Sequence, residues 1–330
     1  MNPRHRRLLI PGLLLALLVV VLVSSLARKA EGAVAEPDVV STLSDPRITE
    51  SSGLVMSRED DDLAYTINDS GSSAVVYAIE VSTGDTVGTA TLDVDLVDTE
   101  ALSIDGDGTL WIADTGDNRS VRDDVALYTT PEFGRTDVTV SPTARYPVTY
   151  PGGAIDVEAL VVQPETNQKY LISKGLFGGT VFALPDPLVE GSPNEAEALP
   201  GDVPGVITDA AFTTDGRHVV ARDYSEAYVL DAADWTILES SPLPTVDQGE
   251  TLAMEASGRS YLVGSEGAGS PLIRIPFSAP EPEATRAPAP VDTSSTPPPG
   301  GNGFAGATWF WAILVIGLLC AISAAATRQR

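Results

Sequence analysis

Residues 98–116 read DTEALSIDGDGTLWIADTG, and this stretch contains the pattern that decides the fold. Apolar and polar residues alternate from Leu102 to Ile104, which indicates a short β-strand. The Asp-Gly pairs of residues 105–108 supply the positive φ angles that tight hairpin turns need. A second strand is expected over Leu110 to Ala113. The stretch therefore predicts a β-hairpin whose first strand opens on an acidic residue, Glu100.

This pattern recurs five times along the chain. Each unit opens on a triplet such as Glu100-Ala101-Leu102, and successive triplets begin 48, 58, 51 and 41 residues apart. Each triplet leads into a strand, a turn, a second strand and a third strand. A helical repeat is excluded because no long segment has a period of 3.6, and a β-sandwich does not account for the regular triplets. The triplets begin at Ser52, Glu100, Glu158, Asp209 and Glu250.

Three or four strands that recur at this spacing are typical of β-propeller blades. We therefore expect an all-β fold, a β-propeller of about five four-stranded blades over residues 34–278. Six blades are the alternative, if residues 131–153 hold a diverged unit. The fifth unit lacks an outer strand, and Val39 to Leu43 is expected to supply it. Closing the ring in this way removes the exposed strand edges.

Four short strings resemble those of a family of bacterial extracytoplasmic propellers. They are Glu50-Ser51-Ser52-Gly53-Leu54, Asn68-Asp69-Ser70-Gly71, Asp98-Thr99-Glu100-Ala101-Leu102 and Asp114-Thr115-Gly116-Asp117-Asn118. The family is similar to the broader set of TolB-like, senescence-marker-like and phytase-like propellers. The resemblance is good over residues 48–120. Elsewhere it is limited to the regular spacing of the blades. It implies the fold but no single activity, because fold analogy alone does not define a reaction.

Polar residues of different units are expected to meet at one rim. The innermost strands of a propeller line its central channel, so their first residues lie beside the last residues of the second strands. This placement predicts a central binding rim and no catalytic residue. The rim residues are Ser52, Asn68, Asp69, Glu100, Asp114, Glu158, Lys174, Asp209, Arg222 and Glu250.

The acidic members of this rim repel one another unless something neutralises them. A hard cation such as Ca²⁺ could lie among them, Lys174 and Arg222 could pair with the acids as a polar plug, or a wide rim could leave the charges solvated. The resemblance to calcium-dependent propellers implies four metal ligands, namely Asn68, Glu100, Asp114 and Glu158. Asp117 and Asn118 are expected to cap the loop in which they lie.

Charge excludes one class of partner. The formal net charge is −26, and seven of the 20 basic residues lie in the terminal segments 1–29 and 328–330. The middle of the chain is therefore more acidic still and would repel phosphate backbones, so we expect no nucleic-acid partner. The only cysteine is Cys320, so the expected propeller has no internal disulfide.

Both ends of the chain predict targeting to a membrane. Residues 1–27 contain a basic start, an apolar run and the small residues of a cleavage site, which predicts a signal peptide or, alternatively, an uncleaved anchor. Residues 279–303 form a Pro/Gly-rich stalk, residues 304–326 a transmembrane helix, and the basic residues 327–330 a cytoplasmic tail. We expect a monomeric, single-pass plasma-membrane protein whose folded domain is extracytoplasmic.

The sequence favours binding over catalysis. His218 is the only histidine of the expected propeller and has no acidic neighbour at its repeat position, so a Ser-His-Asp triad is unsupported. We expect a ligand-binding or scaffold module that acts through its acidic rim, with a surface protein, a peptide or a glycan as partner. The alternative is a Ca²⁺-dependent hydrolase of an ester, lactone or phosphoester. Lys174 and Arg222 argue against a hydrolase, because they occupy rim positions at which a metal site needs neutral or acidic oxygens.

Overall fold

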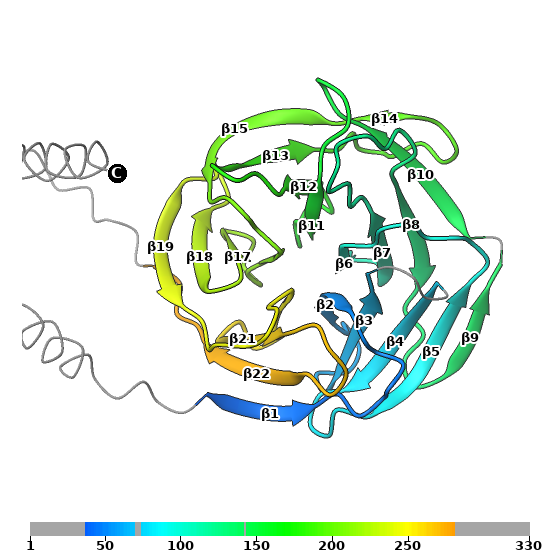
Figure 1. Ribbon diagram of the computed structural model, residues 1–330, viewed down its shortest axis with the longest axis vertical. Helices are drawn as coiled ribbons and strands as arrows, with labels where there is room; N and C mark the ends of the chain where they lie inside the picture. Colours follow the sequence, from blue (N-terminus) through cyan, green and yellow to red (C-terminus); the bar gives the residue numbers. More distant parts are fainter. Residues whose placement is uncertain (1–36, 70–73, 142, 281–330) are drawn as a thin grey trace, which may run out of the picture. The chain divides into compact units, whose positions relative to one another are not determined.

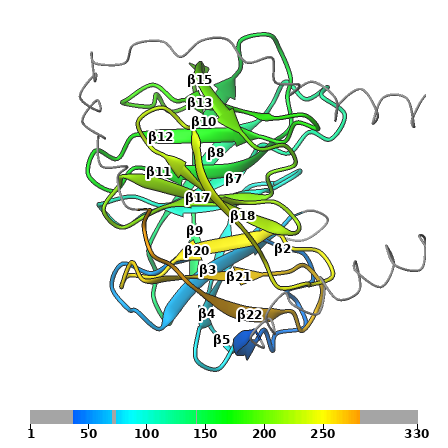
Figure 2. The same cartoon turned by 90° about the vertical axis from the view of Figure 1, so that its left-hand side faces the viewer.

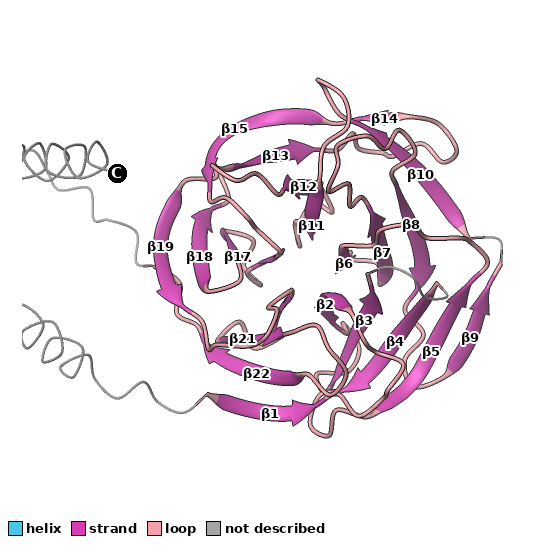
Figure 3. Ribbon diagram, viewed as in Figure 1, coloured by secondary structure: helices cyan, strands magenta, loops and turns pink. Residues whose placement is uncertain are grey.

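The computed structural model of the protein describes residues 37–69, 74–141 and 143–280. The chain divides into two units, Met1–Pro280 and Glu281–Arg330, and all the described residues belong to the first. The predicted signal peptide, transmembrane helix and cytoplasmic tail lie outside the described residues, as does nearly all of the predicted stalk. Within the described part, no helix is long and apolar enough to cross a bilayer. Figure 3 shows that part as strands joined by loops.

In the described part, five sheets, antiparallel except for one outer strand in each of two blades, are arranged around a common axis (Figure 1), which confirms the expected all-β propeller of five blades. Each sheet begins with an inner strand at the axis, and the second and third strands follow outward by short turns. The inner strands are β2 (Ser51–Met56), β6 (Ala101–Ile104), β11 (Val157–Val162), β16 (Asp209–Phe212) and β20 (Thr251–Met254). The second strands are β3 (Leu63–Asn68), β7 (Thr109–Asp114), β12 (Lys169–Ser173), β17 (His218–Arg222) and β21 (Ser260–Gly264). The third strands are β4 (Val75–Glu80), β8 (Ala126–Pro131), β13 (Gly179–Ala183), β18 (Glu226–Asp231) and β22 (Pro271–Pro276).

The outer strands join neighbouring blades to one another. Strand β9 leaves the second blade to pair in parallel with β5 of the first, and β14 leaves the third to pair in parallel with β10 of the second. Residues 131–153 therefore supply outer strands, and the alternative of a sixth blade is wrong. The outer strands are β5 (Thr86–Leu92), β9 (Asp137–Val140), β10 (Ala144–Thr149), β14 (Asn194–Glu195), β15 (Glu197–Val203) and β19 (Ile237–Pro242).

The ring closes as the sequence predicted. Strand β1 (Asp38–Thr42) pairs antiparallel with β22, so the N-terminal end of the domain completes the last blade. Leu43, which follows β1, is 2% exposed and packs in the core between the last blade and the first. The two ends of the domain are thus held in one sheet, and β22 has no free edge.

The core lies between adjacent blades rather than at the axis. Between the first two blades, Leu63 and Tyr65 of β3 pack against Leu102 of β6 and Leu110 of β7. Similar buried clusters fill the other interfaces between blades. Figure 2, turned by 90°, shows how the strands twist within each sheet, and this twist lets neighbouring sheets pack face to face.

Glycine is required at position 53, in the first triplet, for a steric reason. Gly53 has a φ of +74°, and a Cβ there would lie 2.5 Å from the backbone nitrogen of Leu102 on β6. The inner strands of the first two blades therefore approach one another so closely that only glycine fits. This contact fixes the start of the inner strands, where the predicted rim residues lie.

Candidate functional site

Ten predicted rim residues lie at one end of the inner hairpins. The register pairs Ser51 with Asn68 and Asp209 with Arg222, so the starts of the inner strands lie beside the ends of the second strands. The Ser52 hydroxyl donates to the Glu100 carbonyl at 3.0 Å, which joins the first blade to the second. Eight of the ten are buried, and Asp69 and Lys174 are half-buried.

Five carboxylates from three blades gather at this rim. Asp69, Asp98 and Glu100 each place an oxygen within 4.8 Å of the others, and Glu100, Asp156 and Glu158 do the same. Glu100 belongs to both groups and therefore connects them. We call Asp69, Asp98, Glu100, Asp156 and Glu158 the carboxylate cluster.

Asp98 and Asp156 were not among the predicted rim residues, although the sequence contains a signal for them. The second and third blades both carry the pattern Asp-x-Glu, as Asp98-Thr99-Glu100 and Asp156-Val157-Glu158. In extended chain, residues two apart point to the same side. Two such patterns at equivalent places in adjacent blades therefore bring four carboxylates to one mouth of the channel.

The charge of the cluster is poorly compensated. The described residues offer it one ion pair, between Lys174 Nζ and Glu158 Oε1 at 2.9 Å. Burial, with the neighbouring Asp98 next in importance, raises the pKa of Asp69 to about 8, and burial raises the pKa of Glu158 to about 8. Burial together with the charge of Glu158 raises the pKa of Glu100 well above its usual range. Without a cation, the cluster therefore retains protons near neutral pH.

Gly116 leaves the space that the cluster occupies. A Cβ at this position would collide with Glu100 Oε1 and would lie 2.6 Å from Asp98 Cγ. The Gly116 amide also donates to the Asp98 carbonyl at 3.0 Å, which holds that part of the loop in place. The oxygens of Asp98 and Glu100 thus converge over a backbone without a side chain, as a metal site of carboxylate ligands requires.

Two of the four predicted metal ligands have other partners. Asn68 Oδ1 accepts hydrogen bonds from the amides of Thr49 and Glu50, both at 3.1 Å. Asp114 Oδ1 accepts from the Asp98 amide and from Arg122 Nη2, both at 2.9 Å. Each residue ends a second strand and fixes the loop that enters its blade. Asn68 and Asp114 therefore position the cluster, whereas Glu100 and Glu158 belong to it.

The expected cap of the loop after β7 is confirmed for Asp117. Asp117 Oδ2 accepts from the Arg122 amide at 2.8 Å, and the Asp117 amide donates to Asp156 Oδ1 at 2.7 Å. The second contact connects the loop of the second blade to the carboxylate cluster.

The two basic residues of the rim have different partners. Lys174 pairs with Glu158, whereas the Arg222 guanidinium donates to three backbone carbonyls, those of Asp223, Thr251 and Gly264. The alternative in which both basic residues pair with acids therefore holds for Lys174 and fails for Arg222. The guanidinium is close enough to the inner strand of the last blade that a Cβ at Gly249 would collide with it.

Asp209 and Glu250 stand apart from the cluster. Asp209 is fully buried, and its two oxygens accept from the amides of Ala210 and Leu252, at 2.8 and 2.6 Å. Glu250 Oε1 accepts from Gln248 Nε2 at 3.2 Å. Burial raises the pKa of both carboxyls. Asp209 thus links β16 to β20, the inner strands of the fourth and fifth blades.

Comparison with known proteins assigns no family to the chain. No family model matches it, and no curated protein matches it. A luciferin-regenerating enzyme of known structure aligns with a TM-score of 0.43 and 9% sequence identity, over 72% of this chain and 95% of that one. The strand order and ring closure of this chain are therefore the basis for describing it as a propeller.

Proposed function

We propose that this protein is a calcium-dependent binding module, in which the carboxylate cluster holds the cation and the surrounding loops hold a protein or peptide partner. The observation that carries the proposal is that five carboxylates form two groups that share Glu100, with Asp98 and Glu100 lying over Gly116 and one lysine ion pair to balance the charge. Ca²⁺ takes six to eight oxygen ligands in flexible geometry. The cluster supplies enough oxygens for most of that shell, and a ligand can complete it.

The loops beside the cluster carry exposed apolar side chains that support a macromolecular partner. Val97 precedes Asp98 and is 53% exposed, and Val121, 72% exposed, lies in the loop that Asp117 caps. Leu176 and Phe177 follow Lys174 and are 82% and fully exposed. Exposed apolar side chains in the loops around a site are a feature of protein-interaction surfaces. An acidic group of the partner would complete the calcium shell while its apolar side chains cover these loops.

A calcium-dependent hydrolase, the alternative function that the sequence suggests, would use the same cation. His218 begins β17, whereas Arg222 at the end of that strand lies at the rim, so the histidine lies at the other end of the hairpin. The rim therefore has no histidine among its described residues to act as general base, and only its carboxyls remain for that role. This favours binding over hydrolysis.

The proposal includes the place of the protein in the cell. The apolar segment 304–326 and the basic residues that follow it support a single-pass anchor with the propeller outside the cytoplasm. Millimolar calcium is available in that compartment, so a site with modest affinity would be filled there.

Direct calcium binding tests the proposal. We expect the full-length protein in lipid nanodiscs to bind one Ca²⁺ by isothermal titration calorimetry, and Glu100→Gln to weaken binding at least tenfold, because Glu100 belongs to both carboxylate groups. Glu165→Gln is the matched control, since Glu165 is an exposed acid of the turn between β11 and β12. An absence of binding at millimolar calcium, or an equal loss in the two variants, would refute the proposal.

The space above Gly116 gives a second test that changes no charge. Gly116→Ala is expected to weaken calcium binding about tenfold, because its Cβ would displace the carboxylates of Asp98 and Glu100. Gly134→Ala serves as control, since a Cβ there meets nothing within 4 Å. Gly134 has a φ of +59°, which alanine disfavours, so Gly134→Ala can lower stability. The two variants are therefore compared by their calcium affinity and not by their stability. Calcium affinity that is unchanged in Gly116→Ala would place the cation elsewhere.

A further inference from the structure

The opposite mouth of the channel contains a second site, unrelated to the carboxylate cluster. A pocket of about 340 Å³ lies among the ends of the inner strands of all five blades. This volume is at the lower end of the range for small-molecule sites, roughly 300 to 1,000 Å³. The inner strands start at the acidic rim and end here, so the two sites lie at opposite ends of the hairpins.

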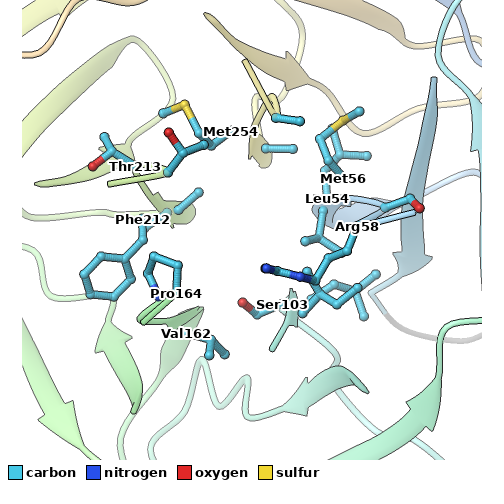
Figure 4. A pocket seen from close by; sticks show the side chains of 18 residues that line it. Leu54, Met56, Arg58, Ser103, Val162, Pro164, Phe212, Thr213 and Met254 are labelled. Atoms are coloured by element: carbon cyan, nitrogen blue, oxygen red, sulfur yellow. The ribbon is translucent and has the colours of Figure 1, made fainter. Parts of the chain in front are cut away.

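Most of the residues that line this pocket have apolar side chains. Met56, Leu102, Val162, Phe212 and Met254 line it, one from each blade, and Figure 4 shows the side chains of Met56, Val162, Phe212 and Met254 around an open centre. The two methionines have flexible, polarisable side chains that adapt to the shape of a ligand. A ligand that fills the pocket would therefore present an apolar body to the wall.

Small residues of the inner strands leave the space for this ligand. Ala211 of β16 and Ser103 of β6 line the pocket at positions next to larger wall residues, and both are half-buried. A larger side chain at either position would project into the open centre. The pocket is thus a consequence of small residues on the inner strands.

One charged side chain of the described residues lines the pocket. Arg58, which follows β2, points its guanidinium into the pocket in Figure 4. It is exposed and, like several other arginines of the described part, makes no ion pair there, but it is the one among them that lines this pocket. In so acidic a domain, an arginine that lines an apolar pocket without a carboxylate partner points to an anionic ligand.

The acid and the hydroxyls near Arg58 differ in how far their hydrogen bonds are satisfied. Glu132 Oε1 accepts from the Arg58 amide at 3.2 Å, from the Ser57 hydroxyl and from the Tyr65 hydroxyl, whereas the buried Glu132 Oε2 accepts from no described residue. The Thr213 hydroxyl donates to Asp215 Oδ1 at 2.6 Å. The Ser103 hydroxyl, in contrast, makes no hydrogen bond to the described residues and points into the pocket in Figure 4. Among the described residues, Arg58, Ser103 and Thr214 are therefore polar groups of the lining that a ligand can reach.

From this arrangement we propose that the pocket binds a small amphipathic carboxylate, such as an aryl-alkanoic acid or a short fatty acid. The carboxylate accepts hydrogen bonds from the Arg58 guanidinium and the Ser103 hydroxyl. The hydrocarbon part lies against the methionines and Phe212. A guanidinium pairs with a carboxylate through two parallel hydrogen bonds, which gives the site its preference for this head group.

Paired probes test this assignment. Binding of 3-phenylpropanoate and of its neutral amide, 3-phenylpropanamide, is measured by isothermal titration calorimetry on the full-length protein in lipid nanodiscs, with empty nanodiscs as blank. We expect the carboxylate to bind at least tenfold more tightly than the amide. Equal affinity of the two probes, or no binding of either, would overturn the proposal.

Three variants locate the site. Arg58→Met should remove the preference for the carboxylate and leave the affinity for the amide unchanged. Arg217→Met changes the same charge at an exposed position outside the pocket and should keep the preference. Ala211→Phe should abolish binding of both probes by filling the open centre. If Arg58→Met keeps the preference for the carboxylate, the proposal is wrong. Because Arg58 is exposed, this variant should fold, so the test remains decisive even if Ala211→Phe does not fold.

Discussion

Replacing Arg222 with alanine is expected to lower the free energy of unfolding by about 3 to 5 kcal/mol. Arg222 is 1% exposed, the largest of the fully buried side chains among the described residues. Its guanidinium donates to the carbonyls of Asp223, Thr251 and Gly264 at 3.0 to 3.2 Å, so it holds the fourth blade to the fifth. The alanine variant would leave these buried carbonyls without donors, and it would remove a positive charge that lies near Asp209.

Equilibrium unfolding in urea measures this loss, and the melting temperature should fall by about 10 °C for a domain of this size. Arg222→Lys is the control, because it keeps the charge but lacks the planar group that reaches several carbonyls. We expect it to be intermediate in stability. If Arg222→Ala lost less than about 1 kcal/mol, water would have to replace the guanidinium, and the role of Arg222 between the blades would be refuted.

The fold was predictable because each repeat is defined by turn residues and alternating apolar residues that are close together in the sequence. The Asp-Gly turn at residues 105–108 and the alternating runs beside it define a hairpin with no information from elsewhere in the chain. Strand β1 was predictable for a different reason, since a ring of sheets needs a partner for the edge of its last blade. The parallel pairing of β9 with β5 was not, because it depends on where the second blade lies relative to the first.

The site was only partly predictable, because the sequence shows which residues reach the rim but not what they contact there. Asn68 and Glu100 both have side chains that can bind a metal. The Asn68 side-chain oxygen, however, already accepts hydrogen bonds from the backbone amides of residues 49 and 50. Pairing of Arg222 with an acid was one of the alternatives, but its guanidinium donates to carbonyls of the fifth blade instead. Asp98 was missed because it precedes the strand, although its spacing from Glu100 repeats in the next blade.

The calcium-free protein is expected to lose stability as the pH rises from 5 to 8.5. The pKa values of Asp69 and Glu158 are raised to about 8, and that of Glu266 to about 7, in each case mainly by burial. The folded protein therefore binds protons more tightly than the unfolded chain, whose carboxyl groups titrate near pH 4. Below pH 4 both states are protonated and this stabilising contribution is complete. It is lost as the pH rises through the raised pKa values.

Calcium should reverse this trend, because it needs the ionised carboxylates that burial disfavours. At 100 times its dissociation constant, calcium adds about 2.7 kcal/mol of stability, which raises the melting temperature by roughly 5 to 10 °C. We expect that increase at pH 8.5 and almost none at pH 5, where the cluster still holds its protons. Thermal unfolding in EDTA and in calcium at both pH values measures the difference, with Asp69→Asn as a variant whose calcium-free curve should be flatter. A calcium-free melting temperature that stays constant or rises from pH 5 to 8.5 would mean that the carboxylates are ionised without a cation. The cluster would then be a set of solvated charges rather than a metal site.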